Sequence, residues 1–131
     1  IANKRANLLY VNQGNDAKGI PLFKEMAADY GLADTSYSTM ANFFDYDNDG
    51  DLDAFISNRD GEADDQRNYL YRNDEGTFID ITDSAGLSMS SHLSFCSIIF
   101  DYNKDGFQDI YISNDKPDNL NILYKNKKPK Q

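Results

Sequence analysis

The chain has 131 residues, enough for one ordinary domain, and 27% of them are charged, which is not a disordered composition. Its net charge of −9 argues against nucleic-acid binding, which requires a basic face. No apolar run approaches the roughly 18–20 residues of a membrane helix, so membrane insertion is not expected. The single cysteine, Cys96, excludes an intramolecular disulfide and is expected to be a small core residue.

The predicted elements are short, rich in Phe, Tyr and Ile, and bounded by Asn, Asp and Gly, a pattern that favours strands. In chain order, strands are expected over residues 8–11, 39–44, 53–57, 69–72, 77–81, 95–100, 110–113 and 122–125. For residues 22–30, a helical turn is expected as the alternative to a strand. The segments 39–44 and 53–57 and their later counterparts are continuously apolar, which predicts sheets covered on both faces.

Three motifs return along the chain. Asn-x-Leu-Tyr-x-Asn occupies residues 7–12, 68–73 and 121–126, and a segment from Phe to Gly-Leu occupies 23–32 and 78–87. The acidic stretch of residues 45–53 returns 56 residues later at 101–109. Self-similarity at such a period is typical of repeat architectures built from stacked units.

Four strands in each unit predict an all-β fold of β-propeller blades, each a four-stranded antiparallel sheet. We expect a partial first unit at residues 1–37, blades at 38–92 and 93–126, and a tail at 127–131. About two blades cannot close a ring. The chain, which begins at Ile1 without a signal-peptide pattern, is therefore expected to be a fragment of a larger propeller, with self-association through open blade faces as the alternative.

The acidic stretches have the residue types of calcium loops. Calcium takes six to eight oxygen ligands, and a glycine in sixth place permits the sharp turn that makes them converge. The predicted ligands are Asp45, Asp47, Asp49, the carbonyl of Asp51, and Asp53 in the first loop, and Asp101, Asn103, Asp105, the carbonyl of Phe107, and Asp109 in the second. We therefore predict about two Ca²⁺ ions, one in each loop.

Other interpretations of the loops are less favourable. An EF-hand needs a bidentate Glu in twelfth place and flanking helices, whereas Ile56 and Ile112 stand there in strand-like runs. Dockerin-type loops lie much closer together. Magnesium demands stricter octahedral geometry. Solvated acidic turns without metal are the simplest alternative, but they would leave close carboxylates repelling one another.

These motifs resemble the FG-GAP/VCBS repeats, which also build the integrin α-subunit propeller. The order Asn-x-Leu-Tyr-x-Asn, Phe to Gly-Leu and Phe-Asp-Tyr-x-x-Asp-Gly-x-x-Asp is similar to secreted bacterial proteins that often carry an ASPIC/UnbV-type domain. The resemblance covers nearly the whole chain. It implies that each loop lies in a β-hairpin between the first two strands of a blade. The Phe-Gly and Gly-Ala-Pro signatures of the integrin type are absent, so integrin-like ligand recognition is not implied.

Other polar groups carry weaker signals. The acidic cluster at residues 59–66 is irregularly spaced and is interpreted as a solvated loop, and His92 has no identifiable catalytic partner. Tyr10, Tyr71 and Tyr124 recur at matching positions, which favours packing between blades over a binding platform. The basic residues near the end of the chain are a short tail with a possible surface contact. No catalytic or cofactor-binding residue is predicted.

The sequence therefore predicts a calcium-stabilised binding or scaffold module, in which the metal has a structural role. We expect an extracellular, periplasmic or cell-surface location and a protein or carbohydrate ligand. A catalytic or non-catalytic domain of a polysaccharide-acting enzyme is the alternative, because propellers also host enzymes. A calcium sensor is a third interpretation, and it would need a two-state element that loops within one sheet do not offer.

Overall fold

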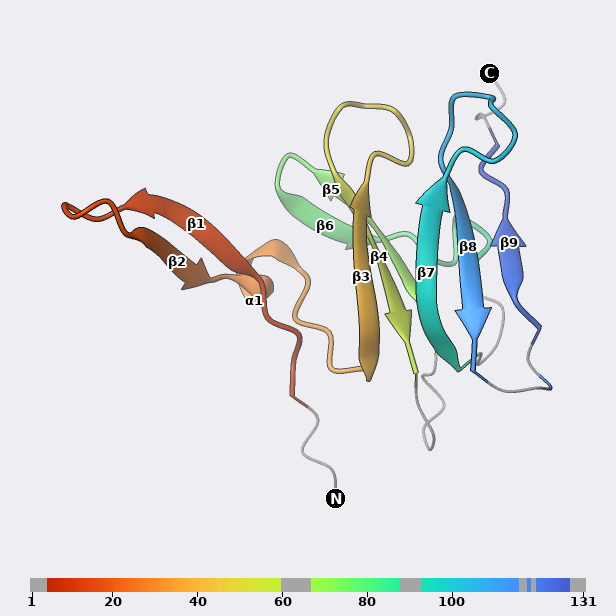
Figure 1. The fold of residues 1–131 in the computed structure, drawn as a ribbon, viewed down its shortest axis with the longest axis horizontal. Helices are drawn as coiled ribbons and strands as arrows, with labels where there is room; N and C mark the ends of the chain where they lie inside the picture. The colour runs from red at the N-terminus through yellow and green to blue at the C-terminus, as the bar shows by residue number, and fades with distance from the viewer. Residues whose placement is uncertain (1–4, 60–66, 88–92, 116–117, 119, 128–131) are drawn as a thin grey trace.

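The structure is a computed structural model, and it describes residues 5–59, 67–87, 93–115, 118 and 120–127. In this part of the chain, strands dominate and form three antiparallel sheets (Figure 1). The elements are β1 (Tyr10–Asn15), β2 (Pro21–Glu25), α1 (Ala27–Tyr30), β3 (Ser38–Phe44), β4 (Asp53–Asn58), β5 (Tyr69–Asp74), β6 (Thr77–Asp80), β7 (Ser94–Phe100), β8 (Asp109–Asn114) and β9 (Ile122–Tyr124). The predicted all-β class is confirmed, and the sheets are consistent with propeller blades.

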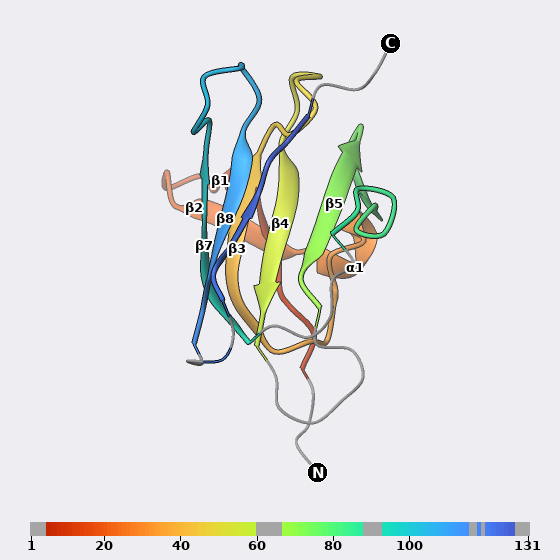
Figure 2. The same ribbon diagram turned by 90° about the vertical axis from the view of Figure 1, so that its right-hand side faces the viewer.

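The sheets follow chain order. The hairpin β1–β2 projects from one side, β3-β4-β5-β6 form the central sheet, and β7-β8-β9 form the third sheet beside it (Figures 1 and 2). The predicted helical turn is confirmed only as α1. Residues 21–25 are instead a strand, because Phe23 pairs across the hairpin with Asn12.

The two hairpins that carry the acidic loops repeat in register. Phe44 pairs with Asp53 at the end of β3, and Phe100 pairs with Asp109 at the end of β7. Each strand pair also has a register irregularity near the start of its first strand. The predicted position of each loop, between the first two strands of its sheet, is confirmed.

Strand β4 is buried along its whole length and separates two hydrophobic clusters. The first cluster consists of Leu32, Ala54, Ile56, Tyr69 and Tyr71. The second consists of Phe44, Phe55, Leu70, Ile110 and Ile112. Alternate side chains of β4 point into opposite clusters, as the pleat of a strand requires. The prediction of two covered faces is therefore confirmed for β4.

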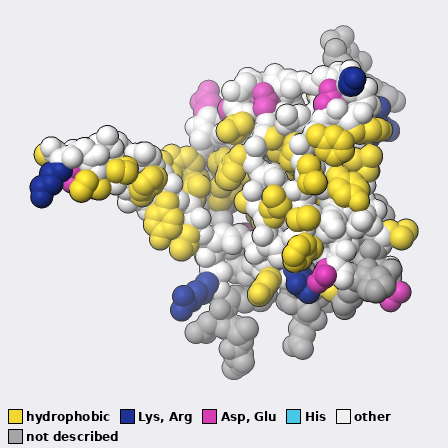
Figure 3. Space-filling model, viewed as in Figure 1, with side chains coloured by type: hydrophobic (Ala, Val, Ile, Leu, Met, Phe, Trp, Pro, Cys, Tyr) yellow, Lys and Arg dark blue, Asp and Glu magenta, His cyan; other side chains and the backbone are white. Residues whose placement is uncertain are grey.

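The same prediction is wrong for β3 and β7. Phe43 is 46% exposed, and Phe95 and Ile98 are each 56% exposed. Hydrophobic side chains gather on this face of the molecule (Figure 3). Both strands lie at an edge of their sheet, and among the described residues no further sheet packs over β7 on this side. An apolar run alone does not reveal which of its faces will find a partner.

The central and third sheets meet through polar contacts between β3, β4 and β7. The Thr39 hydroxyl donates to the Ser94 carbonyl at 3.1 Å, and the Asn42 amide donates to the Ser97 hydroxyl at 2.7 Å. The Ser97 hydroxyl also lies 2.7 Å from that of Ser57. Cys96 between these serines is half-buried and is not a fully enclosed core residue. The polar contacts hold the strands, and hence their acidic loops, side by side.

The repeated tyrosines differ in their surroundings. Tyr71 is buried in the first cluster, and Tyr124 packs against the second cluster, where the central and third sheets meet. Burial raises the pKa of both phenols. Tyr10 is 60% exposed on the projecting hairpin. The predicted role in packing between blades holds for Tyr71 and Tyr124 and is wrong for Tyr10.

Each Gly-Leu motif ends a turn, the first after β2 and α1 and the second after β6. Gly31 and Gly86 have left-handed φ angles of 82° and 74°. The Leu32 N–H donates to the Ala27 carbonyl at 2.8 Å, which turns the leucine toward the first cluster. A Cβ atom at residue 31 would lie 2.6 Å from the Phe78 carbonyl oxygen, whereas at residue 86 it would meet open space.

We expect Gly31→Ala to destabilise the fold more than Gly86→Ala. Both substitutions place a side chain in a left-handed conformation, which costs about 1–3 kcal/mol. Only Gly31→Ala adds a clash with the backbone of β6. Urea denaturation of the two variants measures the difference. Equal losses of free energy of unfolding would show that the close approach between Gly31 and Phe78 is not a tight contact.

Candidate metal sites

The first acidic loop is a compact turn between β3 and β4. Asn48 and Gly50 adopt left-handed φ angles of 61° and 99°, which fold residues 45–53 back on themselves. Asn is among the few non-glycine residues that accept this conformation readily. Both oxygens of Asp45 accept backbone hydrogen bonds at 3.1 Å, from Asp49 and Gly50. These bonds hold the turn closed from inside.

Three carboxylates converge within this turn. Asp45, Asp47 and Asp49 each present an oxygen, and these oxygens all lie within 4.8 Å of one another. Like charges at such distances repel, and a divalent cation between them would reverse the sign of the interaction. The sequence prediction that these three side chains point to one place is confirmed.

Two carboxylate oxygens of the loop are buried without a hydrogen-bond partner in the described residues. They are Oδ1 of Asp47 and Oδ1 of Asp51. A buried acceptor of this kind is costly unless something pairs with it. Oxygen ligands are what calcium requires. The donor set therefore fits a calcium ion, and it adds the Asp51 carboxylate to the carbonyl predicted from the sequence.

Asp53, in ninth place, fastens the loop to the rest of the sheet. Its side chain is fully buried. Oδ2 accepts the Tyr46 N–H at 2.8 Å, and Oδ1 accepts the Asn73 N–H at the end of β5 at 2.9 Å. Burial raises the pKa of Asp53, and the two N–H donors oppose that rise. Asp53 lies outside the group of three, but each oxygen keeps a second lone pair, so it stays a predicted ligand.

The second loop has the same backbone frame. Lys104 and Gly106 adopt left-handed φ angles of 61° and 89°. The two oxygens of Asp101 accept the N–H groups of Asp105 at 3.1 Å and Gly106 at 2.9 Å. The repeat in sequence is therefore also a repeat in hydrogen bonding. The carbonyl of Phe107, a predicted ligand, follows this turn.

The carboxylate of Asp105 is already paired within the second loop. The Asn103 amide donates to its Oδ2 at 2.8 Å, and the Lys125 ammonium group lies 3.8 Å from the same oxygen. The Asn103 hydrogen bond is the main cause of the lowered pKa of Asp105, and Lys125 adds to it. An incoming cation would have to compete with these groups for Asp105, whereas Oδ1 of Asp47 has no hydrogen-bond partner among the described residues.

Asp109 repeats the role of Asp53. It is fully buried, and its oxygens accept the N–H groups of Tyr102 at 3.1 Å and Asn126 at 2.8 Å. No site role for Asn73 or Asn126 was predicted from the sequence. Both are the last residue of Asn-x-Leu-Tyr-x-Asn, and the recurrence of that asparagine was the signal that could have identified them.

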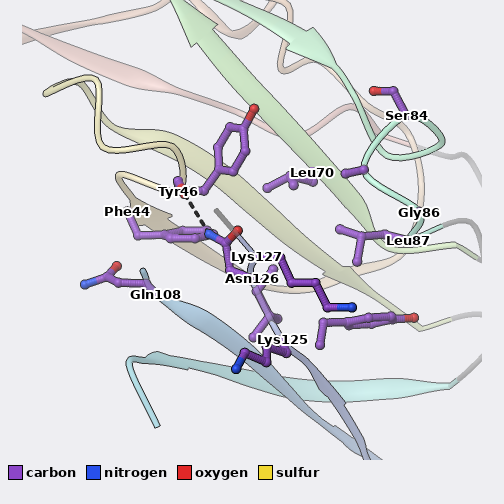
Figure 4. Close-up of a pocket in the computed structure, with 13 residues that line it drawn as sticks. Phe44, Tyr46, Leu70, Ser84, Gly86, Leu87, Gln108, Lys125, Asn126 and Lys127 are labelled. Carbon is purple, nitrogen blue, oxygen red and sulfur yellow. Dashed lines mark hydrogen bonds between the residues drawn. The ribbon is translucent and has the colours of Figure 1, made fainter. Parts of the chain in front are cut away.

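A groove lies between the central and third sheets, with a volume of about 540 Å³ (Figure 4). Phe44, Leu70 and Ile110 form its apolar lining, and Lys125 and Lys127 also lie along it. No Asp, Glu, His or Arg is among the described residues that line it.

Two further candidates lie mainly outside the described residues: His92, and the acidic cluster apart from Arg59. Arg59 itself forms an ion pair with Asp115 just beyond β8. Within the residues described, no helix is long and apolar enough to cross a bilayer.

Residues 45–112 match the family model described as FG-GAP-like repeat. The match covers just over half of the chain. It begins at the first residue of the first acidic loop and extends through the second loop into β8. No curated protein matches the chain.

The electrostatics of the first loop predict an effect of pH on stability. Desolvation and the charges of Asp49 and Asp47 raise the pKa of Asp51 above its ordinary value of 3.8. The folded chain therefore holds the Asp51 proton more tightly than the unfolded chain. Its contribution to stability falls as the pH rises through the ordinary and folded pKa values, and it stays low above them.

We expect Asp51→Asn to raise the melting temperature in chelator at pH 7 and to lose this advantage progressively as the pH falls below the ordinary value of 3.8, where the carboxyl becomes protonated in both states. Saturating calcium should reverse the order at pH 7, because the variant lacks a charged ligand. Asp29→Asn, an exposed change outside both loops, is the control. A variant less stable than the parent in chelator at pH 7 would contradict the predicted repulsion.

Proposed function

The chain belongs to the FG-GAP-like repeat family, and we propose that it is a calcium-stabilised β-propeller module for binding or scaffolding, without catalytic activity of its own. The observation that carries this proposal is the first loop. It brings an oxygen from each of Asp45, Asp47 and Asp49 within 4.8 Å of one another, and two buried carboxylate oxygens of the loop have no hydrogen-bond partner in the part of the chain that the structure describes.

The metal has a structural role in this proposal. The loop is anchored through Asp53 to Tyr46 on one side and to Asn73 of β5 on the other. A cation that offsets the repulsion among the loop carboxylates would therefore stabilise the junction of three strands. Each loop closes on itself, which favours one ion per loop over a shared two-metal catalytic centre.

We propose a secreted, periplasmic or cell-surface setting, with the repeats of the VCBS type and associated with an ASPIC/UnbV-type domain. FG-GAP-like membership and the residue order of the motifs support this setting. So does the chemistry, because extracellular calcium modules bind at about 10⁻⁴–10⁻³ M, in a range where a structural ion stays bound outside the cell.

The proposed partner is a protein or a carbohydrate, and a second copy of the chain is the alternative occupant of the open sheet face. The exposed apolar side chains of β3 and β7 support an interaction on that face, because contiguous exposed apolar patches often mark binding surfaces. A polysaccharide-acting enzyme domain is less favoured, since carboxylates and histidines are missing from the described lining of the groove.

We expect the first loop to bind calcium about tenfold more tightly than the second, equal to roughly 1.4 kcal/mol. Asp105→Ala leaves the first loop as the remaining site, and Asp49→Ala leaves the second. At positions 1, 3, 5 and 9 the first loop presents four acidic side chains and the second presents three, and Asp105 is already paired with Asn103. Calorimetric titration of the two variants gives the two affinities. Equal affinities, or a tighter second loop, would contradict this order.

Chelation should lower the melting temperature. Calcium at ten times its dissociation constant adds roughly 1.4 kcal/mol of stability per site. Scanning calorimetry with calcium and with excess chelator measures the shift, and the Asp49→Ala, Asp105→Ala double variant is the control that should no longer respond. An unchanged melting temperature of the parent in chelator would refute the stabilising role of the metal.

A further inference from the structure

We propose that the two loops bind calcium with positive cooperativity, and that Asn48 and Asn126 are the positioning residues that couple them. This inference rests on the proposed function, since it assumes that both loops take calcium. It adds that the ions do not bind independently. The loops lie at the same end of the strands in neighbouring sheets (Figure 1). The side-chain amides of Asn48 and Asn126 connect them.

Asn48 makes the direct connection between the loops. It is the fourth residue of the first loop, and its Nδ2 donates to the Gly106 carbonyl of the second loop at 3.1 Å. Its left-handed backbone belongs to the turn that brings Asp45, Asp47 and Asp49 together. The side chain that reaches the second loop is therefore held by the same turn that would close around the first ion.

The hydrogen bond from Asn48 to the Gly106 carbonyl affects Asp105, a predicted ligand of the second site, through one peptide plane. The carbonyl of Gly106 and the N–H of Phe107 belong to the same planar peptide unit. That N–H donates to Oδ1 of Asp105 at 3.1 Å. When Asn48 holds the carbonyl, the orientation of the N–H is also restricted, and with it the placement of the Asp105 carboxylate.

Asn126 makes the second connection. Its backbone N–H donates to Asp109 of the second loop at 2.8 Å, while its side chain donates to the Tyr46 carbonyl of the first loop at 2.7 Å. The Tyr46 N–H in turn donates to Asp53 at 2.8 Å. A hydrogen-bonded path therefore joins the ninth residues of the two loops.

This path is specific to the contact between the two sheets. Asn73 occupies the equivalent position in the central sheet, and its backbone N–H makes the equivalent bond to Asp53. Its side chain, however, donates to Leu52 within its own unit at 3.1 Å. The local sequence motif thus supplies the asparagine, and the neighbouring sheet determines whether its side chain couples two loops.

Coupling follows from shared ordering. An ion in the first loop restricts the turn, and with it Asn48 and Tyr46, so the second loop is ordered before its own ion arrives. Ligand-induced ordering of this kind gives positive cooperativity, and the effect is reciprocal between the sites. Direct repulsion between two cations would act in the opposite direction, so the sign of the coupling tests the proposal.

The amides of Gly50 and Gly106 allow each loop to be followed separately. They donate to Asp45 and Asp101 within their own loops. Calcium titration monitored by the NMR signals of these two amides therefore assigns an affinity to each site. The matched variants are Asn48→Gly, which removes the connecting amide, and Lys104→Gly, which alters the equivalent residue of the second loop. Glycine preserves the left-handed backbone at both positions.

We expect Asn48→Gly to weaken calcium binding at the second loop about fivefold, the lower end of typical coupling strengths. Lys104→Gly should cause no such weakening, since it removes a positive charge from the loop and leaves the connecting amide in place. Asp49→Ala, which disables the first loop, should weaken the second loop by a similar factor. In the Asp49→Ala background, Asn48→Gly should then have little additional effect. Asn126→Ala should reduce the coupling further, provided that its circular dichroism spectrum is that of the parent.

Three outcomes would overturn the coupling. They are an unchanged second-loop affinity in Asn48→Gly, equal effects of Asn48→Gly and Lys104→Gly, and additive effects of Asn48→Gly and Asp49→Ala. A second loop that binds more tightly when the first is disabled would also overturn it, in favour of repulsion between the ions. If calcium shifts neither glycine amide in the parent chain, the proposed function fails as well, and the two failures are thereby distinguished.

Discussion

Two buried aspartates hold the acidic loops to the sheets, and the rest of the arrangement depends on them. Asp53 and Asp109 each accept two backbone N–H groups, one from the start of their own loop. The other comes from Asn73 near the end of β5 or from Asn126 just beyond β9. A buried carboxylate needs such partners because its desolvation is costly. Each aspartate therefore fixes the loop relative to three strands at once. The loop can then gather its other carboxylates without unfolding the hairpin.

The sheets stack through a core that the repeat itself provides. Strand β4 contributes alternate side chains to the clusters on its two faces, so the central sheet is stabilised from both sides. Where β3 and β4 meet β7, hydroxyl and amide groups fix the register. Because the same register sets the positions of the two loop tips, the packing between sheets also brings Asn48 to Gly106. The interface between the central and third sheets thus both stabilises the fold and positions the contact between the two loops.

Much of this could be predicted from the sequence. The strands, the position of each loop in its hairpin and the convergence of Asp45, Asp47 and Asp49 depend on residues close together in the chain, and repetition reinforced each signal. The coverage of β3 and β7 could not be predicted, because an apolar run does not specify which neighbour will pack on it. Strand β2 was also missed, since its pairing with β1 outweighed the local preference for a turn.

By itself the sequence determined the repeated β-unit and the two oxygen-rich loops, since ligand spacing around a glycine turn is a property of nine consecutive residues. Only the tertiary structure decided how these loops differ and how they connect. Lys125 approaches Asp105, Asn48 reaches Gly106, and Asn126 reaches Tyr46 across separations of 20, 58 and 80 residues. Such contacts exist because packed sheets place their edges together, and no local pattern of residues encodes that juxtaposition.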